Sequence, residues 1–270
     1  MLLPTMSAVG RMLLRTSFGC RREAGRSAAM LGVWPISYAE WVMDPTPRIS
    51  SDVDRSLNPA LTLLLRVALY AVAAFSLAST IATLNEVAAF DDLMRTGRSV
   101  SVTELAAAEG LTEGFARLAF WVGLAAGGLT IVWWYRAYQV VAAARPTGRT
   151  WSARWAVGSW FIPFANMVIP KLVLNEIDRI SRAAESGDAD WRSEPLTVLP
   201  HWWWFFWVGG LVLTLVGVGI SAGEMAAATF RSDAYRTGLV LTEWGFAAST
   251  LAGFLGAASV RVIGARLHSL

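Results

Sequence analysis

Four long apolar segments separated by polar ones dominate the hydrophobic pattern of the chain. Each has about the 20 residues that a helix needs to cross a hydrocarbon core of about 30 Å. They cover residues 61–84, 118–138, 202–222 and 239–260. The pattern therefore predicts an all-α fold, a polytopic integral membrane protein whose four transmembrane helices form a domain over residues 61–265.

A fifth apolar segment, residues 155–176, is interrupted by prolines and polar residues. Pro163 and Pro170 lack backbone donors, and in a helix interior each costs about 3 kcal/mol or more. Irregular backbone at membrane depth is tolerated only where protein or a water-filled cavity satisfies its polar groups. We therefore expect residues 155–185 to form a re-entrant or interfacial segment on the cytoplasmic side that turns back near the two prolines. Asn166, which lies between them, is expected to hydrogen-bond the backbone of the turn.

Residues 169–185 have the period of an amphipathic helix lying along the membrane interface. One stripe is apolar (Ile169, Leu172, Val173, Ile177, Ile180, Ala184), and the opposite side is polar (Lys171, Asn175, Asp178, Arg182, Glu185). Glu176 falls inside the apolar stripe, where a carboxylate must be paired, protonated or in contact with water. We expect it to pair with an arginine such as Arg154, Arg136 or Arg179. The alternative is a carboxylate that lines a cavity open to the cytoplasm.

Two regions outside these segments carry separate expectations. Residues 1–42 are arginine-rich and poor in acids, and they are expected to be an extension of the gene model or a disordered N-terminus. Residues 43–60 then form a polar lead-in. In the first loop, Ser101 and Glu104 have the capping-box spacing and Gly110 is a stop signal, so a short separate helix is predicted there.

Composition supports the membrane interpretation and indicates its orientation. Hydrophobic residues make up 55% of the chain and charged residues only 16%, against about a quarter in a typical soluble domain. The 85–117 loop has three basic residues, the 136–201 loop has eight, and the 223–238 loop has two. The positive-inside rule then places the second loop and both termini in the cytoplasm. Nucleic acid is not expected as a partner, because the arginines are spread over the helix ends.

Residue usage indicates the source of the chain and the depth of the second loop. The basic residues are almost all arginine, and with abundant alanine and glycine this bias indicates a bacterial gene, hence the bacterial cytoplasmic membrane. Ten of the 14 tryptophans fall between Trp133 and Trp207. Tryptophan is enriched at membrane interfaces, so we expect the second loop to be embedded in the interface.

The fifth segment resembles a known family motif. Its residues are Trp160-Phe161, Pro163, Asn166, Pro170 and Glu176-Ile177, with Trp155 upstream. This run is similar to the pattern of an uncharacterised bacterial membrane-protein family, domain of unknown function 4328. Val140 stands where that pattern has an asparagine. The resemblance is expected to cover roughly residues 60–265, and it implies a topology but no known activity.

No set of residues in the sequence predicts catalysis, a cofactor or a metal. The only histidines are His201 and His268, and Cys20 is the only cysteine. Asp188 and Asp190 form a DxD pattern in a polar loop, where solvation is the simpler interpretation. Catalytic and nucleotide-binding motifs are absent from workable contexts. We therefore expect a protein that is not an enzyme and has no cofactor.

Small residues indicate close helix packing. Gly123 and Gly127 form a GxxxG pattern in the second predicted span, and the fourth has small residues every four positions (Gly245, Ser249, Gly253, Ala257). We expect both sets to pack inside the four-helix domain. A homodimer interface is the alternative.

Together these features favour a non-enzymatic envelope scaffold or partner-binding protein. Its expected partners are the lipid bilayer and a membrane protein or a second copy of the chain. The alternative is a small transporter or channel-like protein with a pathway near Asn166 and Glu176. A water-filled cavity that reaches both residues would favour transport, and tight packing would favour the scaffold. The candidate residues are Trp155, Trp160, Phe161, Pro163, Asn166, Pro170 and Glu176.

Overall fold

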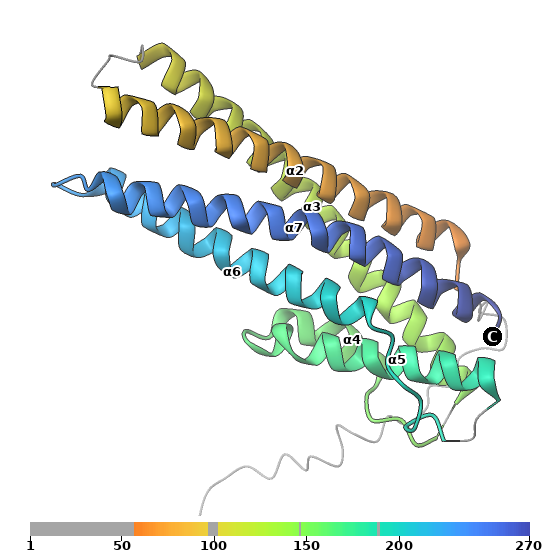
Figure 1. Ribbon diagram of the computed structural model, residues 1–270. Coiled ribbons are helices and arrows are strands. Elements are labelled where there is room, and N and C mark those ends of the chain that lie inside the picture. Colours follow the sequence, from red (N-terminus) through yellow and green to blue (C-terminus); the bar gives the residue numbers. More distant parts are fainter. Residues whose placement is uncertain (1–56, 97–101, 146, 188–189) are drawn as a thin grey trace, which may run out of the picture. The chain divides into compact units, whose positions relative to one another are not determined.

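The computed structural model describes residues 57–96, 102–145, 147–187 and 190–270, which all belong to one compact unit, Thr46–Leu270. Within these ranges the chain is helical and has no strand (Figure 1). The elements are α2 (Pro59–Thr96), α3 (Val102–Ala144), α4 (Ala153–Gly158), the short 3-10 helices η1 (Ser159–Phe161) and η2 (Ala165–Met167), α5 (Ile169–Ser186), α6 (Leu199–Ala226) and α7 (Ser232–His268). The expectations for residues 1–42 and for most of the lead-in lie outside the described residues.

Four helices are long and apolar enough to cross a membrane, which confirms the predicted all-α class. The candidate spans are Pro59–Arg95, Glu109–Ala144, Leu199–Ala226 and Ser232–His268. Each is longer than the apolar segment that predicted it. Charged residues beyond an apolar segment lower its hydropathy without ending the helix, because most of them have good helix propensity.

The first loop is shorter than predicted. Gly110 does not end a separate helix there, because α3 runs without a break from Val102 to Ala144. A glycine inside a helix costs only about 1 kcal/mol relative to alanine. The good helix formers on both sides of Gly110 outweigh that cost. Ser101 itself lies outside the described residues.

The long helices pack in the order α6, α7, α2, α3, so that α7 runs between α2 and α6 (Figure 1). Glycines allow the closest approach. A Cβ atom added at Gly245 would lie 2.7 Å from the backbone nitrogen of Thr214 on α6, and one added at Gly253 would lie 2.6 Å from the Leu69 oxygen on α2. The small residues of the fourth span therefore pack inside the domain, as predicted.

The packing predicted for the GxxxG pattern of α3 is wrong. A Cβ atom added at Gly123 or at Gly127 would meet no atom within 4 Å. The neighbouring side chains of Phe120, Trp121 and Leu124 are exposed as well. This face of α3 therefore contributes nothing to packing among the described residues.

The two ends of the domain differ in construction. The hairpin end holds the first residues of α2 and α6, the last residues of α3 and α7, and the short helices α4 and α5 (Figure 1). The distal end holds the opposite termini of the four long helices. There, an ion pair joins Arg236 of α7 to Asp91 of α2 with oxygen–nitrogen distances of 2.7 and 2.8 Å.

Candidate functional site

The chain between α3 and α6 forms a helical hairpin, residues 153–186, which contains the motif predicted to carry function. Helix α4 continues into η1, the chain reverses over residues 162–168, and α5 returns along the same end of the domain. Helix α5 begins at the predicted residue and ends one residue after the predicted end. The spacing of its apolar residues therefore predicted the bounds of α5 to within one residue.

The turn of the hairpin is held by its own backbone. The Asn166 N–H donates to the Ile162 carbonyl oxygen (3.0 Å), and the Ala165 N–H donates to that of Pro163 (2.7 Å). Phe164 has a φ of 62° and a ψ of −39°, a positive-φ conformation that is uncommon for any residue other than glycine. Such strained residues cluster at functional sites. The predicted bond from the Asn166 side chain is wrong, because in the described residues its amide has no hydrogen-bond partner and only its backbone participates.

Neither proline interrupts a helix. Pro170 lies in the first turn of α5, where a missing N–H costs nothing because that position has no intrahelical acceptor. Pro163 lies exposed in the reversal itself. Pro163 thus lies in the turn and Pro170 near the start of α5. Neither incurs the cost of a proline in a helix interior.

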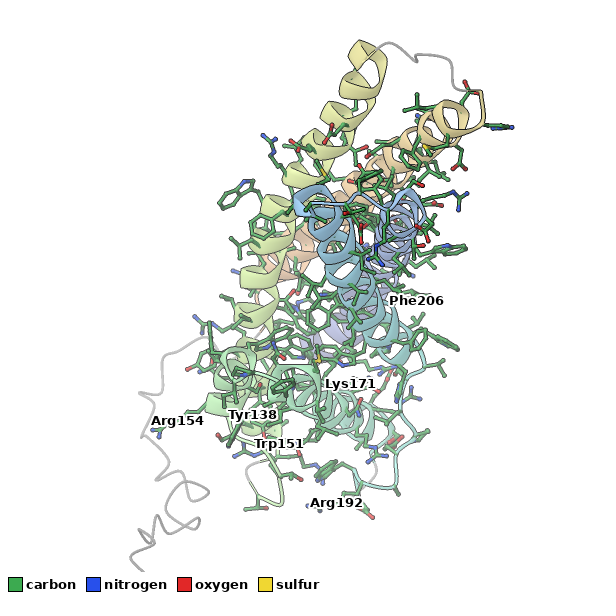
Figure 2. All side chains as sticks on the ribbon, turned by 90° about the vertical axis from the view of Figure 1, so that its left-hand side faces the viewer. Tyr138, Trp151, Arg154, Lys171, Arg192 and Phe206 are labelled. Carbon is green, nitrogen blue, oxygen red and sulfur yellow. The ribbon has the colours of Figure 1, made fainter. Side chains whose placement is uncertain are left out.

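Glu176 anchors the hairpin to the end of α3. Its side chain is buried, as predicted, with only 4% of the residue exposed. One carboxylate oxygen accepts a hydrogen bond from the Tyr138 hydroxyl (2.8 Å), and the other accepts one from the Thr150 backbone N–H (3.0 Å). The Trp151 N–H lies 3.4 Å from the first oxygen. The Tyr138 hydroxyl also contacts the Trp151 carbonyl oxygen, and these two residues lie together at the hairpin end (Figure 2).

The predicted arginine partner of Glu176 is wrong. Among the described residues, the carboxylate contacts a phenol and backbone amides, and none of Arg154, Arg136 and Arg179 reaches it. The Arg149 guanidinium lies over the ring of Tyr138, with its Cζ 5.6 Å from the ring centre. Several well-placed donors can satisfy a buried carboxylate without a direct ion pair.

Asp178 is a second buried acid, which the sequence pattern placed on the polar side of α5. Its carboxylate accepts hydrogen bonds from the Thr197 N–H and hydroxyl (2.7 Å each) and from the Arg266 guanidinium (2.8 Å). Only 1% of Asp178 is exposed. These contacts join α5 to the segment before α6 and to the last turn of α7.

Lys171, the only lysine of the chain, also lies on the side of α5 predicted to be polar. Its Nζ atom is buried and has no hydrogen-bond partner among the described residues. Desolvation of the ammonium group lowers the pKa of Lys171 to about 8, while the Asp178 carboxylate acts in the opposite direction. Part of the side of α5 that was predicted to be solvated is therefore buried.

Five tryptophans hold the hairpin between α3 and α6. The ring centre of Trp160 in η1 lies 4.8 Å from that of Trp134 in α3 and 5.8 Å from that of Trp207 in α6. The Trp204 indole N–H donates to the Met167 carbonyl oxygen in the turn (2.8 Å). We call this set the tryptophan cluster: Trp134, Trp160, Trp203, Trp204 and Trp207. Tryptophans that the sequence placed at the membrane interface thus pack against one another.

The outer surface of the turn is apolar and exposed. Phe164 is 84% exposed and Phe161 is 74% exposed, although both belong to an otherwise firmly held segment. Ile162 and Val168 are exposed beside them. These four residues, which we call the hairpin tip, leave an apolar patch that no described part of the chain covers.

The histidines and acids of the described residues are spread over the domain. The described residues contain no group of three or more histidine, cysteine, aspartate or glutamate side chains that could hold a metal ion. His201 is exposed at the start of α6, where its ring nitrogen lies 3.0 Å from the Thr197 carbonyl oxygen. His268 is exposed in the last turn of α7. Cys20 and Asp188 lie outside the described residues.

A family model for a domain of unknown function (DUF4328) matches residues 96–265. The protein belongs to the DUF4328 family. The match confirms the resemblance drawn from the hairpin motif, but it begins at the last residue of α2, so the first span precedes the matched region. Neither curated proteins nor solved structures contain a significant match to the chain.

Within the DUF4328 domain, the seven motif residues differ in burial. Pro170 and Glu176 are buried and Trp155, Trp160 and Asn166 are half-buried, whereas Phe161 and Pro163 are exposed. Sequence reasoning gave no role to Tyr138, Thr150 or Asp178. No periodic pattern indicated that the Tyr138 hydroxyl and backbone amides 25 and 26 residues before Glu176 would be the partners of its carboxylate.

Proposed function

We propose that this DUF4328 protein is a non-enzymatic, multi-pass protein of the bacterial cytoplasmic membrane that binds a membrane-protein partner through the hairpin tip. One observation carries the proposal: a strained, apolar and exposed turn is held rigidly in place. Glu176 and the tryptophan cluster fix the hairpin from two directions. Large exposed apolar patches mark interaction sites, and a rigid patch loses little conformational entropy on binding.

The depth of the tip favours a partner within the membrane. Trp204, which bonds the turn at Met167, lies in the second turn of α6, and α6 is a candidate span. The tip is thus expected to enter the membrane by only a few turns, as a shallow re-entrant segment. The eight basic residues of the 136–201 region support a cytoplasmic location for the hairpin end and for both termini.

The packing around the motif favours this proposal over transport. A pathway needs water at its polar groups, but the Glu176 carboxylate is enclosed by Tyr138 and the 150–151 backbone. Neither the cavity lined by Glu86 and Tyr235 nor the one lined by Asn85 and Phe115 includes Asn166 or Glu176. Transport through this region therefore has no supporting feature.

Photocrosslinking at the tip tests the proposal. We expect a photoreactive phenylalanine analogue at Phe164 to form a discrete protein adduct in native membranes. A second copy of the chain or another membrane protein would support the proposal. The same analogue at Phe254, which is 50% exposed on α7, is the matched control and should give lipid adducts only. Lipid adducts alone at both positions would contradict partner binding through the tip.

A further inference from the structure

A cavity of about 340 Å³ lies at the distal end, away from the hairpin. Its lining comes from all four long helices, and most of it is apolar, from Phe90, Leu93, Met94, Met225, Phe230 and Leu239. The polar lining residues are Glu86, Glu109 and Tyr235. The volume falls at the lower end of the range for small-molecule sites, which is about 300–1,000 Å³.

Aromatic rings are arranged around one wall of this cavity. The ring centre of Tyr235 lies 5.4 Å from that of Phe90 and 5.5 Å from that of Phe230. The faces of such rings attract organic cations. Flexible methionine side chains, of which Met225 is 64% exposed, adapt to ligands of varied shape.

The carboxylates of the cavity have no cationic partner among the described residues. Glu86 is only 4% exposed, and its hydrogen-bond partners are the Thr112 side chain and the Tyr235 hydroxyl, which lies 3.5 Å away. The charge of Glu109 repels that of Glu86. A cation beside such a carboxylate would add a counter-charge that its neutral hydrogen-bond donors do not supply.

The arginines that form ion pairs at the distal end are engaged by other acids. Arg231 pairs with Glu224, Arg236 with Asp91, and Arg117 with Glu113. None of these three acids lines the cavity. The two carboxylates that do line it have no ion pair with any residue that the structure describes.

We propose that this cavity binds a hydrophobic organic monocation, an amine or quaternary ammonium group attached to an apolar body. Glu86 and Glu109 supply the counter-charge, the Tyr235 and phenylalanine rings contact the cation, and the leucines and methionines cover the apolar part. A metal ion fits less well, because the described residues offer no group of three ligands. The cavity is separate from the hairpin tip. A negative result for one of the two proposals would therefore leave the other unchanged.

Binding of benzyltrimethylammonium to the purified full-length protein in detergent tests this site. Calorimetry should show saturable binding of the cation at least about tenfold tighter than that of neopentylbenzene, its uncharged isostere. Benzenesulfonate, an anion with the same ring, should not bind. Equal affinity for the cation and its isostere, or preferential binding of the anion, would overturn the proposal.

Matched variants locate the binding to the cavity. Glu86→Gln should weaken binding of benzyltrimethylammonium by about tenfold or more, because the buried counter-charge is lost. Glu109→Gln, at a half-buried position, provides the same test if Glu86→Gln fails to fold. Glu113→Gln removes the same charge outside the cavity and should change the affinity much less. Unchanged affinity in a folded Glu86→Gln or Glu109→Gln variant would refute the assignment.

Discussion

At the residue scale, α5 has two buried acids, Glu176 and Asp178, and their hydrogen-bond partners differ. Glu176 is satisfied by a phenol and by backbone amides of the turn that precedes the hairpin. Asp178 is satisfied by a threonine and by Arg266, which is 88 positions away in sequence. Breaking a buried pair is costly because the remaining polar group is left without a partner. Both residues therefore fix the position of α5.

Glu176→Gln should destabilise the protein by about 1–3 kcal/mol. Glutamine has nearly the same shape, but its amide group offers one acceptor oxygen where two oxygens now face donors. Its NH₂ group would point at the Tyr138 hydroxyl or at the Thr150 N–H. Thermal unfolding of the detergent-solubilised protein measures the change.

Glu185→Gln is the matched control. The Glu185 side chain is 64% exposed and lies 3.4 Å from the Arg266 guanidinium, so its replacement should change stability by no more than about 0.5 kcal/mol. Equal loss of stability in the two variants would contradict an anchoring role for Glu176.

The burial of Glu176 could be predicted from the sequence, whereas its partners could not. Burial followed from the helical period, because Glu176 falls among residues that recur on one face. The partners depend on how the 145–152 turn folds back over α5, which no periodic pattern encodes. For Asp178, the same period gave the wrong answer. The buried face of α5 is wider than the apolar stripe, and it includes Leu174, Ser181 and Asp178.

At the element scale, the contact between α6 and α7 depends on glycines rather than on large apolar side chains. A Cβ atom added at Gly217 would lie 2.6 Å from both the Gly238 oxygen and the Thr242 nitrogen on α7. Backbone atoms cannot move aside as a flexible side chain can. The two helix axes would have to separate, and the packing along the whole contact would weaken.

Gly217→Ala should therefore lower stability by about 1–3 kcal/mol. Gly219→Ala, two residues further along α6, is the control, because a Cβ atom there would meet nothing within 4 Å. That variant should be neutral or stabilised by up to about 1 kcal/mol, as alanine is the better helix former. Unfolding in a denaturing detergent titration compares the two. A loss at Gly219 as large as that at Gly217 would show that backbone propensity, not the contact, sets the cost.

Small-residue patterns predicted this contact only in part. The four-residue repeat of the fourth span does lie against its neighbours, but the equally clear Gly123 and Gly127 pattern in α3 faces open space. Spacing shows that a helix can be approached closely. It does not show which helix approaches, because that depends on the order α6, α7, α2, α3, which no local pattern contains.

At the scale of the whole molecule, the two ends carry different chemistry. The hairpin end has the tryptophan cluster, the buried acids of α5 and most of the basic residues of the loops. The distal end has an apolar cavity with carboxylates in its lining. The first residue of α2 and the last residue of α7 both lie at the hairpin end (Figure 1). The asymmetry in basic residues then predicts that this side is cytoplasmic.

Cysteine labelling tests this arrangement directly. With Cys20→Ser as the background, single cysteines are introduced at Ser186, at the end of α5, and at Ser232, at the start of α7. A membrane-impermeant maleimide should label Ser232→Cys in intact cells and Ser186→Cys only after permeabilisation. The reason is geometric: the hairpin returns to the end at which it starts, so α5 and the first residue of α7 are separated by one span, α6. Labelling of both positions from the same side would mean that the hairpin segment crosses the membrane. A reversed pattern would keep four spans but place the basic hairpin end outside, against the charge asymmetry.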